Sequence, residues 1–247
     1  MLAIFLLPLT AQPETDSAKK SKSKMDEAES LFFRSIIYQD SNPAKAFELV
    51  SKAAGMGYLR AQDYLAYMYE NGIGTTRNYS EAIKWYTRAS ESGYTASQYT
   101  LGYMYEKGEG VPVSYSKALH YYKLAANKNY PYAKYQMASM YEDGRGVAKD
   151  YNFAQSLYKD AAEEDYYNAQ LALGKMYMNG KGIPKNNVLA LKWFIIAAER
   201  YGIYDAVLCR RDLIKNMSSE EISEAENLAF EWMQKRTPTD FQITNKK

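Results

Sequence analysis

Few residues in this chain have side chains suited to covalent or metal chemistry. The 247 residues include one cysteine, Cys209, and one histidine, His120. A thiolate and an imidazole within hydrogen-bonding reach of each other would make a nucleophile and its general base. One cysteine cannot form a disulfide within the chain, and one histidine cannot supply a multi-histidine metal site. Nucleophilic chemistry therefore depends on whether the fold brings Cys209 and His120 together.

Two recurring features invite a cofactor or metal interpretation. Gly-x-Gly pairs are part of dinucleotide-binding motifs, but those motifs follow a strand and open a helix. The sulfurs of Met68, Met104, Met140 and Met176 are potential soft ligands. The chain has no P-loop, no Gly-x-Ser-x-Gly, no His-Glu-x2-His and no Cys-x2-Cys. We predict no cofactor and no metal.

The charge balance argues against another class of function. Thirty-one basic residues against 29 acidic ones leave a net charge of +2, which gives no electrostatic footprint for nucleic acid or an acidic membrane surface. The apolar run from Leu2 to Leu9 is shorter than the roughly 20 residues that span a bilayer. It is typical of the hydrophobic part of a secretory signal, with cleavage after Ala11.

We therefore expect residues 1–11 to be a signal peptide and the protein to be periplasmic or secreted, with a cytoplasmic location as the alternative. Residues 12–24 are polar, aperiodic and rich in lysine and serine, which predicts a disordered linker. Residues 237–247 are expected to form a flexible tail.

A period of 36 residues organises the rest of the chain. Each unit has an apolar residue, a tyrosine four positions later and a Gly-x-Gly pair after that. The pairs are Gly72/Gly74, Gly108/Gly110, Gly144/Gly146 and Gly180/Gly182. Ten residues after each first glycine begins a second stripe, for example Ala82, Trp85, Tyr86 and Ala89. Spacings of three, four and seven residues place side chains on one face of a helix. Each unit is thus predicted to be a helix, a glycine turn and an antiparallel helix.

One such hairpin cannot bury its apolar face alone, whereas stacked neighbours can. The sequence predicts an all-α fold, a right-handed α/α solenoid of about six helix-turn-helix repeats over residues 25–236. The leading repeat begins with a helix from about Met25 to Gln39, and Asn42 and Pro43 open its second helix. At the other end, Ala206 begins a first helix one residue out of register. A capping box at residues 218–221 then opens a last helix that ends near Lys235.

The solenoid separates the two reactive residues. Cys209 and His120 are 89 residues apart, and packed helices lie about 8–10 Å apart, so this separation implies roughly 20–25 Å. A nucleophile and its base must approach within ~3 Å. We therefore predict that the protein is not an enzyme. The methionine series, spaced by whole repeats, is predicted to fill the core between repeats.

The repeat resembles the Sel1-like repeat, which is related to tetratricopeptide repeats. The resemblance runs from about Asp40 to Trp232, and one unit carries it clearly: Ala133-x3-Met137-Ala138-x2-Tyr141-x2-Gly144-x-Gly146-Val147, then Asp150-x3-Ala154-x3-Tyr158-x2-Ala161-Ala162. It implies a scaffold or adaptor that holds partner proteins. Two narrower functions are also implied. One is an immunity protein that neutralises a secreted toxin such as a lipase. The other is a penicillin-interacting, β-lactamase-like protein, disfavoured because the paired cysteines of that branch are absent.

By analogy with tetratricopeptide stacks, the first helix of each repeat lines a groove. The expected groove positions hold tyrosines beside an acidic row, which we define as Glu70, Glu106 and Glu142. The predicted partner-binding residues are Asp63, Tyr67, Glu70, Tyr99, Tyr103, Glu106, Tyr135 and Glu142. Tyrosine suits interfaces because its side chain offers a large contact area and has few rotatable bonds, so binding costs little conformational entropy. The hypothesis is a groove that binds a protein or peptide segment and favours basic residues; the acidic row could instead be solvated surface. A monomer is favoured.

In the next unit the pattern changes to Leu171, Lys175 and Met178 at the groove positions. The predicted groove is therefore tyrosine-rich and acidic in the earlier repeats and differs in the last full repeat.

Overall fold

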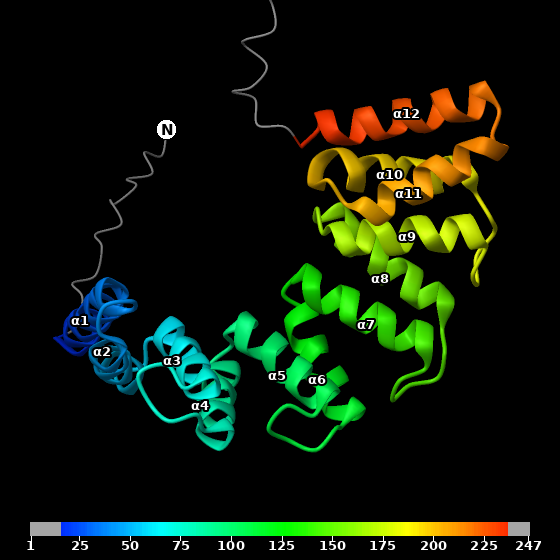
Figure 1. Ribbon diagram of the computed structural model, residues 1–247. Coiled ribbons are helices and arrows are strands. Elements are labelled where there is room, and N and C mark those ends of the chain that lie inside the picture. Colours follow the sequence, from blue (N-terminus) through cyan, green and yellow to red (C-terminus); the bar gives the residue numbers. More distant parts are fainter. Residues whose placement is uncertain (1–15, 237–247) are drawn as a thin grey trace, which may run out of the picture. The chain divides into compact units, whose positions relative to one another are not determined.

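The computed structural model describes residues 16–236, and every regular element among them is helical (Figure 1). Five successive helix pairs follow the repeat: α1 (Asp16–Tyr38) with α2 (Pro43–Gly55), α3 (Leu59–Asn71) with α4 (Tyr79–Glu91), α5 (Thr95–Lys107) with α6 (Tyr115–Ala126), α7 (Pro131–Asp143) with α8 (Tyr151–Glu163), and α9 (Tyr167–Asn179) with α10 (Asn187–Tyr201). Then come α11 (Tyr204–Leu213), a 3-10 turn (Ile214–Asn216) and α12 (Ser219–Gln234). The predicted all-α repeat solenoid is confirmed.

The helix starts follow from capping side chains placed once per repeat. Asn78, Asp150 and Asn186 each accept a hydrogen bond from the backbone N–H three residues later, at 2.8–3.1 Å. These bonds satisfy N–H groups that the first helical turn leaves unpaired. At α12 the predicted capping box is present, with Ser218 and Glu221 each bonding the other's backbone N–H.

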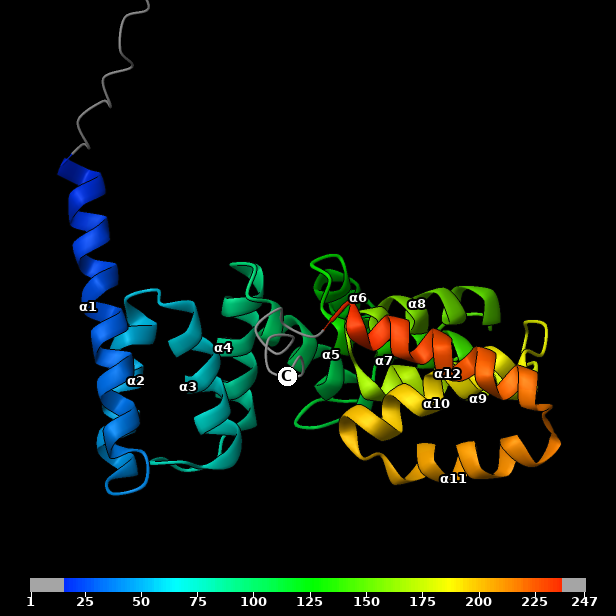
Figure 2. The ribbon, with the colours of Figure 1, turned by 90° about the horizontal axis from the view of Figure 1, so that it is seen from above.

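The N-terminal helix differs from the sequence-based prediction. Residues 16–24, expected to belong to a disordered linker, are helical, and α1 begins at Asp16 instead of near Met25. Figure 2 shows α1 extending past α2 at its N-terminal end. This stretch lacks apolar periodicity, but it contains no glycine or proline and is rich in lysine, a good helix former. Residues 1–15 and 237–247, with the predicted signal peptide, the rest of the linker and the tail, lie outside the described residues.

The chain divides into two compact units, residues 1–97 and 98–247. The core of the first unit contains Phe32, Val50, Leu65 and Met68, and that of the second contains Tyr122, Leu173, Phe194 and Trp232. The four recurring methionines are at most 2 % exposed, which confirms that they fill the core.

The last helix closes the second unit by packing on the helix pair before it. α12 lies along α10 (Figures 1 and 2). The Trp193 and Trp232 rings meet edge to face at 5.7 Å between centroids. Charged residues such as Glu220, Glu224 and Glu231 are exposed on α12, as expected of a terminal helix that caps a repeat array.

The two glycines of each loop have different tasks. The first ends a helix in the left-handed conformation: Gly144, at φ +75°, donates its N–H to the Met140 carbonyl. The second lies against the preceding repeat. A Cβ on Gly182 would stand 2.0 Å from Cβ of Tyr151, and a Cβ on Gly146 would stand 2.4 Å from Cβ of Tyr115. The second glycine is therefore the point where a loop touches the start of the previous repeat's second helix.

Gly180→Ala and Gly182→Ala form a matched test of this contact. Both glycines have positive φ, +66° and +72°, so alanine costs about 1–2 kcal/mol of backbone strain at either position. A methyl on Gly180 meets its nearest neighbours at 3.4 Å, an ordinary contact distance. We expect Gly182→Ala to lower the free energy of unfolding by about 1–3 kcal/mol more than Gly180→Ala, because only it overpacks the repeat junction. Urea denaturation followed by circular dichroism measures both, and equal losses would contradict this role of the second glycine.

Candidate functional site

The predicted groove residues of the first unit are already partly engaged within the protein. The Asp63 carboxylate accepts a hydrogen bond from Ser97 Oγ at 2.6 Å, and Glu70 accepts one from the Tyr86 hydroxyl at 2.8 Å. Tyr67 is 44 % exposed, so it is the most open of the three predicted residues in this unit.

In the second unit the acidic residue of the α5 repeat is internal. Glu106 is only 4 % exposed. Its carboxylate accepts hydrogen bonds from the Tyr122 hydroxyl at 2.7 Å, from Lys107 Nζ at 3.0 Å and from Arg145 Nη1. Tyr99 and Tyr103, its predicted companions, are half-buried, and the Tyr99 ring packs against that of Tyr122. Glu106 therefore acts as a buried counter-ion within the repeat stack.

The same glutamate–tyrosine bond recurs in three repeats, always between residues 16 positions apart. The pairs are Glu70–Tyr86, Glu106–Tyr122 and Glu142–Tyr158, with oxygen–oxygen distances of 2.7–2.8 Å. In the next repeat the corresponding residues are Met178 and Phe194. Acid and hydroxyl disappear together, which is the expected pattern if the two groups serve each other, because either one alone would be left without its partner in a half-buried position.

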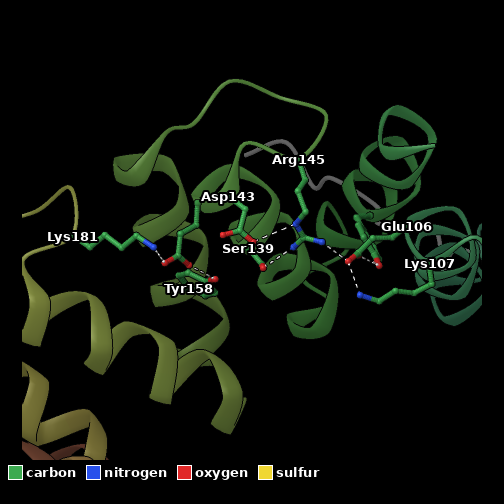
Figure 3. Close-up of polar contacts among 9 residues, drawn as sticks. Glu106, Lys107, Ser139, Asp143, Arg145, Tyr158 and Lys181 are labelled. Carbon is green, nitrogen blue, oxygen red and sulfur yellow. Dashed lines mark hydrogen bonds and ion pairs between the residues drawn. The ribbon is translucent and has the colours of Figure 1, made fainter. Parts of the chain in front are cut away.

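The Gly-x-Gly loops supply cations to this row (Figure 3). Arg145 and Lys181 are the middle residues of two such loops, and each pairs with a glutamate 39 residues earlier, on the first helix of the preceding repeat. Arg145 reaches Glu106 and also donates to Ser139 Oγ at 2.7 Å; Lys181 reaches Glu142 at 2.9 Å. Two of the three carboxylates in the acidic row are thus neutralised internally. Sequence reasoning missed these pairs, although a base between the two glycines was a usable signal.

The electrostatics of Glu106 follow from these partners. Burial raises the pKa of its carboxyl, but hydrogen bonds from Tyr122, Lys107 and Arg145 outweigh burial and hold the pKa below the ordinary value of 4.5. A pKa lowered by folding contributes stability that is present above the unfolded-state value and is lost as pH falls through the folded-state value.

Glu106→Gln should therefore show a stability defect that depends on pH. We expect the variant to be less stable than the unmodified protein near pH 7, and the difference to shrink as the pH falls below about 4. Thermal unfolding near pH 7 and below pH ~4 measures the difference in stability between the variant and the unmodified protein. Glu231→Gln, on the exposed face of α12, is the control. A defect of constant size across the pH range would contradict a role for the carboxylate charge.

Tyr86 and Glu70 offer a test of the recurring pair in the first unit. Tyr86→Phe removes the donor and should cost about 1.5–3 kcal/mol, the usual value of a hydrogen bond to a charged group. The double variant Tyr86→Phe/Glu70→Met reproduces the Phe194 and Met178 combination, so we expect it to lose less stability than the sum of the two single variants. Urea denaturation of the unmodified protein, the two single variants and the double variant gives the interaction energy by a double-mutant cycle. Additive losses would mean that the two side chains do not interact.

An open cleft lies within the second unit, lined mainly by residues of α7 and α9. Its volume is about 360 Å³, and we refer to it as the α7–α9 cleft. It includes Tyr135 and Glu142, two of the eight predicted partner-binding residues, and Leu171 and Lys175, where the groove pattern changes. The complete lining is Tyr135, Ser139, Glu142, Tyr158, Asn168, Leu171, Ala172, Lys175, Met176, Asn179 and Lys181.

The cleft arises where tyrosines are replaced by smaller or non-aromatic residues. Ser139, on α7, stands where the α5 repeat has Tyr103. Leu171, on α9, stands where the α7 repeat has Tyr135. Close packing would fill these positions in a regular array. The α7 repeat lacks one of the two rings, at Ser139, and the α9 repeat lacks both, at Leu171 and Lys175; all three residues line the opening. The six other predicted residues, from Asp63 to Glu106 in sequence, are not part of it.

Neither of the reactive residues singled out from the sequence lines this cleft. His120 is exposed on α6, with its ring against that of Tyr121, and Cys209 is a free, half-buried thiol on α11. In the part of the chain that the structure describes, no group of three or more histidine, cysteine or acidic side chains is placed to hold a metal ion. No helix of residues 16–236 is both long and apolar enough to cross a membrane.

Helix pairs of 36 residues, joined by glycine loops and stacked through small residues and rings, define an α-solenoid of the tetratricopeptide-like class. The Sel1 repeat model matches residues 30–58, 59–94, 95–130, 131–166, 168–201 and 222–235. The chain belongs to the Sel1 repeat family.

Solved structures support the same fold. A Sel1 repeat protein from Oxalobacter formigenes is 26% identical, with a TM-score of 0.71, over 88% of this chain and 90% of that one. An immunity protein from Pseudomonas aeruginosa is 16% identical, with a TM-score of 0.51, over 88% of this chain and 86% of that one. The second likeness concerns the fold alone. No curated protein gave a significant match.

Proposed function

We propose that this protein is a non-catalytic scaffold that binds a segment of a partner protein in the α7–α9 cleft. Sel1 repeats typically mediate protein interaction, and the open, polar and aromatic lining of the cleft supports this site within the second unit. A repeat array is a rigid support for such a surface, because each helix is fixed by its neighbours.

The cleft combines the two features that a peptide site needs. Leu171, Ala172 and Met176 give it apolar lining, while Asn168 and Asn179 add amide groups that can form hydrogen bonds. Tyr135 is half-buried against the rings of Tyr158 and Tyr166, at 5.5 and 5.3 Å between centroids. A ring held on two sides is already ordered, so binding a partner against its free side costs little additional entropy.

The remaining predicted residues keep a secondary place in this proposal. Tyr67, Tyr99 and Tyr103 are exposed or half-buried and would extend the contact along the first helices. Asp63, Glu70, Glu106 and Glu142 already have partners, so we propose that they stabilise the scaffold more than they bind a ligand.

Two narrower aspects of the proposal concern location and role. The apolar run at residues 2–9 supports export to a bacterial envelope. An immunity protein would be a special case of the scaffold, distinguished by one tight cognate toxin in place of several moderate partners.

Filling the cleft tests the proposed site. Ser139→Tyr/Leu171→Tyr introduces the tyrosines that the preceding repeats carry at the equivalent positions, and so adds two rings to the lining of the opening. Because it also removes the Ser139 hydroxyl that accepts a hydrogen bond from Arg145, circular dichroism first checks that the variant is folded. We expect it to weaken partner binding at least tenfold, or by about 1.4 kcal/mol. The measurement is affinity capture from the native source, followed by titration of the captured partner.

Asn152→Tyr/Lys159→Tyr is the matched control, because both residues are exposed on α8 outside the cleft. Retention of the partner by the control and its loss from the cleft variant would support the site. If the cleft variant bound the partner as tightly as the control, the proposed site would be excluded.

A further inference from the structure

The charge of the α7–α9 cleft is opposite to what the acidic row predicts from sequence. Its one carboxylate, on Glu142, accepts the Tyr158 hydroxyl at 2.8 Å and pairs with Lys181 at 2.9 Å. A second lysine, Lys175, also lines the cleft, and no carboxylate lies as close to it as Glu142 lies to Lys181. With two lysines and one glutamate, the lining carries an excess of one positive charge.

Lys175 is available to a ligand. Its side chain is 44 % exposed, and its nearest acid is Asp205, whose Oδ2 lies 3.8 Å from Nζ and whose side chain is 64 % exposed. An exposed pair at this distance contributes little, since water screens both charges. A carboxylate from a partner, held inside the cleft with less water around it, would compete successfully with Asp205 for Lys175.

Neutral donors reinforce the preference for an acidic ligand. Asn168 and Asn179 line the cleft with amide groups. The Asn168 amide donates one N–H to the Tyr166 hydroxyl at 2.8 Å and has a second N–H for a ligand. Burial raises the pKa of Tyr135, and the charge on Glu142 raises it further. The Tyr135 hydroxyl therefore stays protonated at neutral pH and can donate a hydrogen bond to an oxygen of the ligand.

The shape of the cleft adds a requirement for an apolar or aromatic side chain. Ser139 and Leu171 leave the space that tyrosine rings occupy in a regular repeat. Ala172, Met176 and the Tyr135 ring line the same cleft. A ring or branched apolar side chain from the ligand would continue the row of tyrosines, and methionine and tyrosine offer it favourable contacts.

We infer that the α7–α9 cleft binds an acidic peptide segment of a partner protein, with an aromatic or large apolar side chain in the gap beside Leu171 and a carboxylate on Lys175. This inference rests on the proposed function and deepens it by naming the chemistry of the ligand. It replaces the preference for basic residues that the acidic row suggested.

The test is selection of random dodecapeptides, displayed on phage, against the full chain immobilised through its N-terminus. We expect enrichment of peptides in which Asp or Glu neighbours Phe, Tyr, Trp or Leu. Synthetic versions of the enriched peptides should bind about tenfold more weakly to Lys175→Glu, because a close charge pair becomes a repulsion. Lys159→Glu makes the same change of charge on the exposed surface of α8 and should leave the affinity unchanged.

The outcomes separate this inference from the proposed function. The selection could instead enrich basic or uncharged peptides whose binding is lost in Ser139→Tyr/Leu171→Tyr. That result would overturn the acidic preference and leave the cleft as a binding site. Acidic peptides that bind Lys175→Glu and Lys159→Glu equally would overturn the role of Lys175. Absence of any enriched peptide, or enriched peptides that bind the cleft-filled variant as tightly as the unmodified protein, would count against both proposals.

Discussion

The glycine loop of each repeat adds a constraint to the junction between consecutive repeats, beside the packing of α2 on α3, α6 on α7 and α8 on α9. Within that loop, the first glycine ends the helix and the second lies against the preceding repeat, where a Cβ on Gly182 would stand 2.0 Å from Tyr151. The residue between them is then aimed back at the first helix of that repeat. Because Arg145 and Lys181 occupy this place, the loop delivers a cation to Glu106 and Glu142. Backbone geometry and electrostatics thus fix the same junction.

Much of the fold follows from the period of the sequence, because a solenoid contains mainly local contacts. Small and bulky residues at spacings of three, four and seven place both helices of each pair, and Asn or Asp at the second-helix starts gives their boundaries. The start of α1 was less predictable. Residues 16–24 lack the apolar stripe by which a packed helix is recognised, yet the helix continues through them because no residue there stops it.

The candidate site was predictable only in part, for a physical reason. Helical periodicity gives the face on which a residue lies, and two of the residues predicted from it, Tyr135 and Glu142, line the cleft. Periodicity does not show which side chains from other elements reach that face. Glu106 lies on the expected face of its helix, but Tyr122 and Arg145 cover it and leave only 4 % of it exposed. To predict the burial of Glu106 from sequence, one would have to know that it contacts residues 16 and 39 positions later in the chain.

In a repeat protein, architecture and recognition can be separated by asking whether a feature recurs. Many of the 25 tyrosines hold equivalent places in successive repeats, and those bonded to glutamate stabilise helix pairs. Met178 and Phe194 show that one repeat can replace the polar pair by an apolar one and keep both residues packed. The cleft has a different origin, because Ser139 and Leu171 stand where the preceding repeats have tyrosine rings, and both line the opening. An opening in an otherwise repeating surface is a local departure from the regular array. Its presence beside a weakly paired lysine is the reason to place partner recognition there, and not along the regular part of the array.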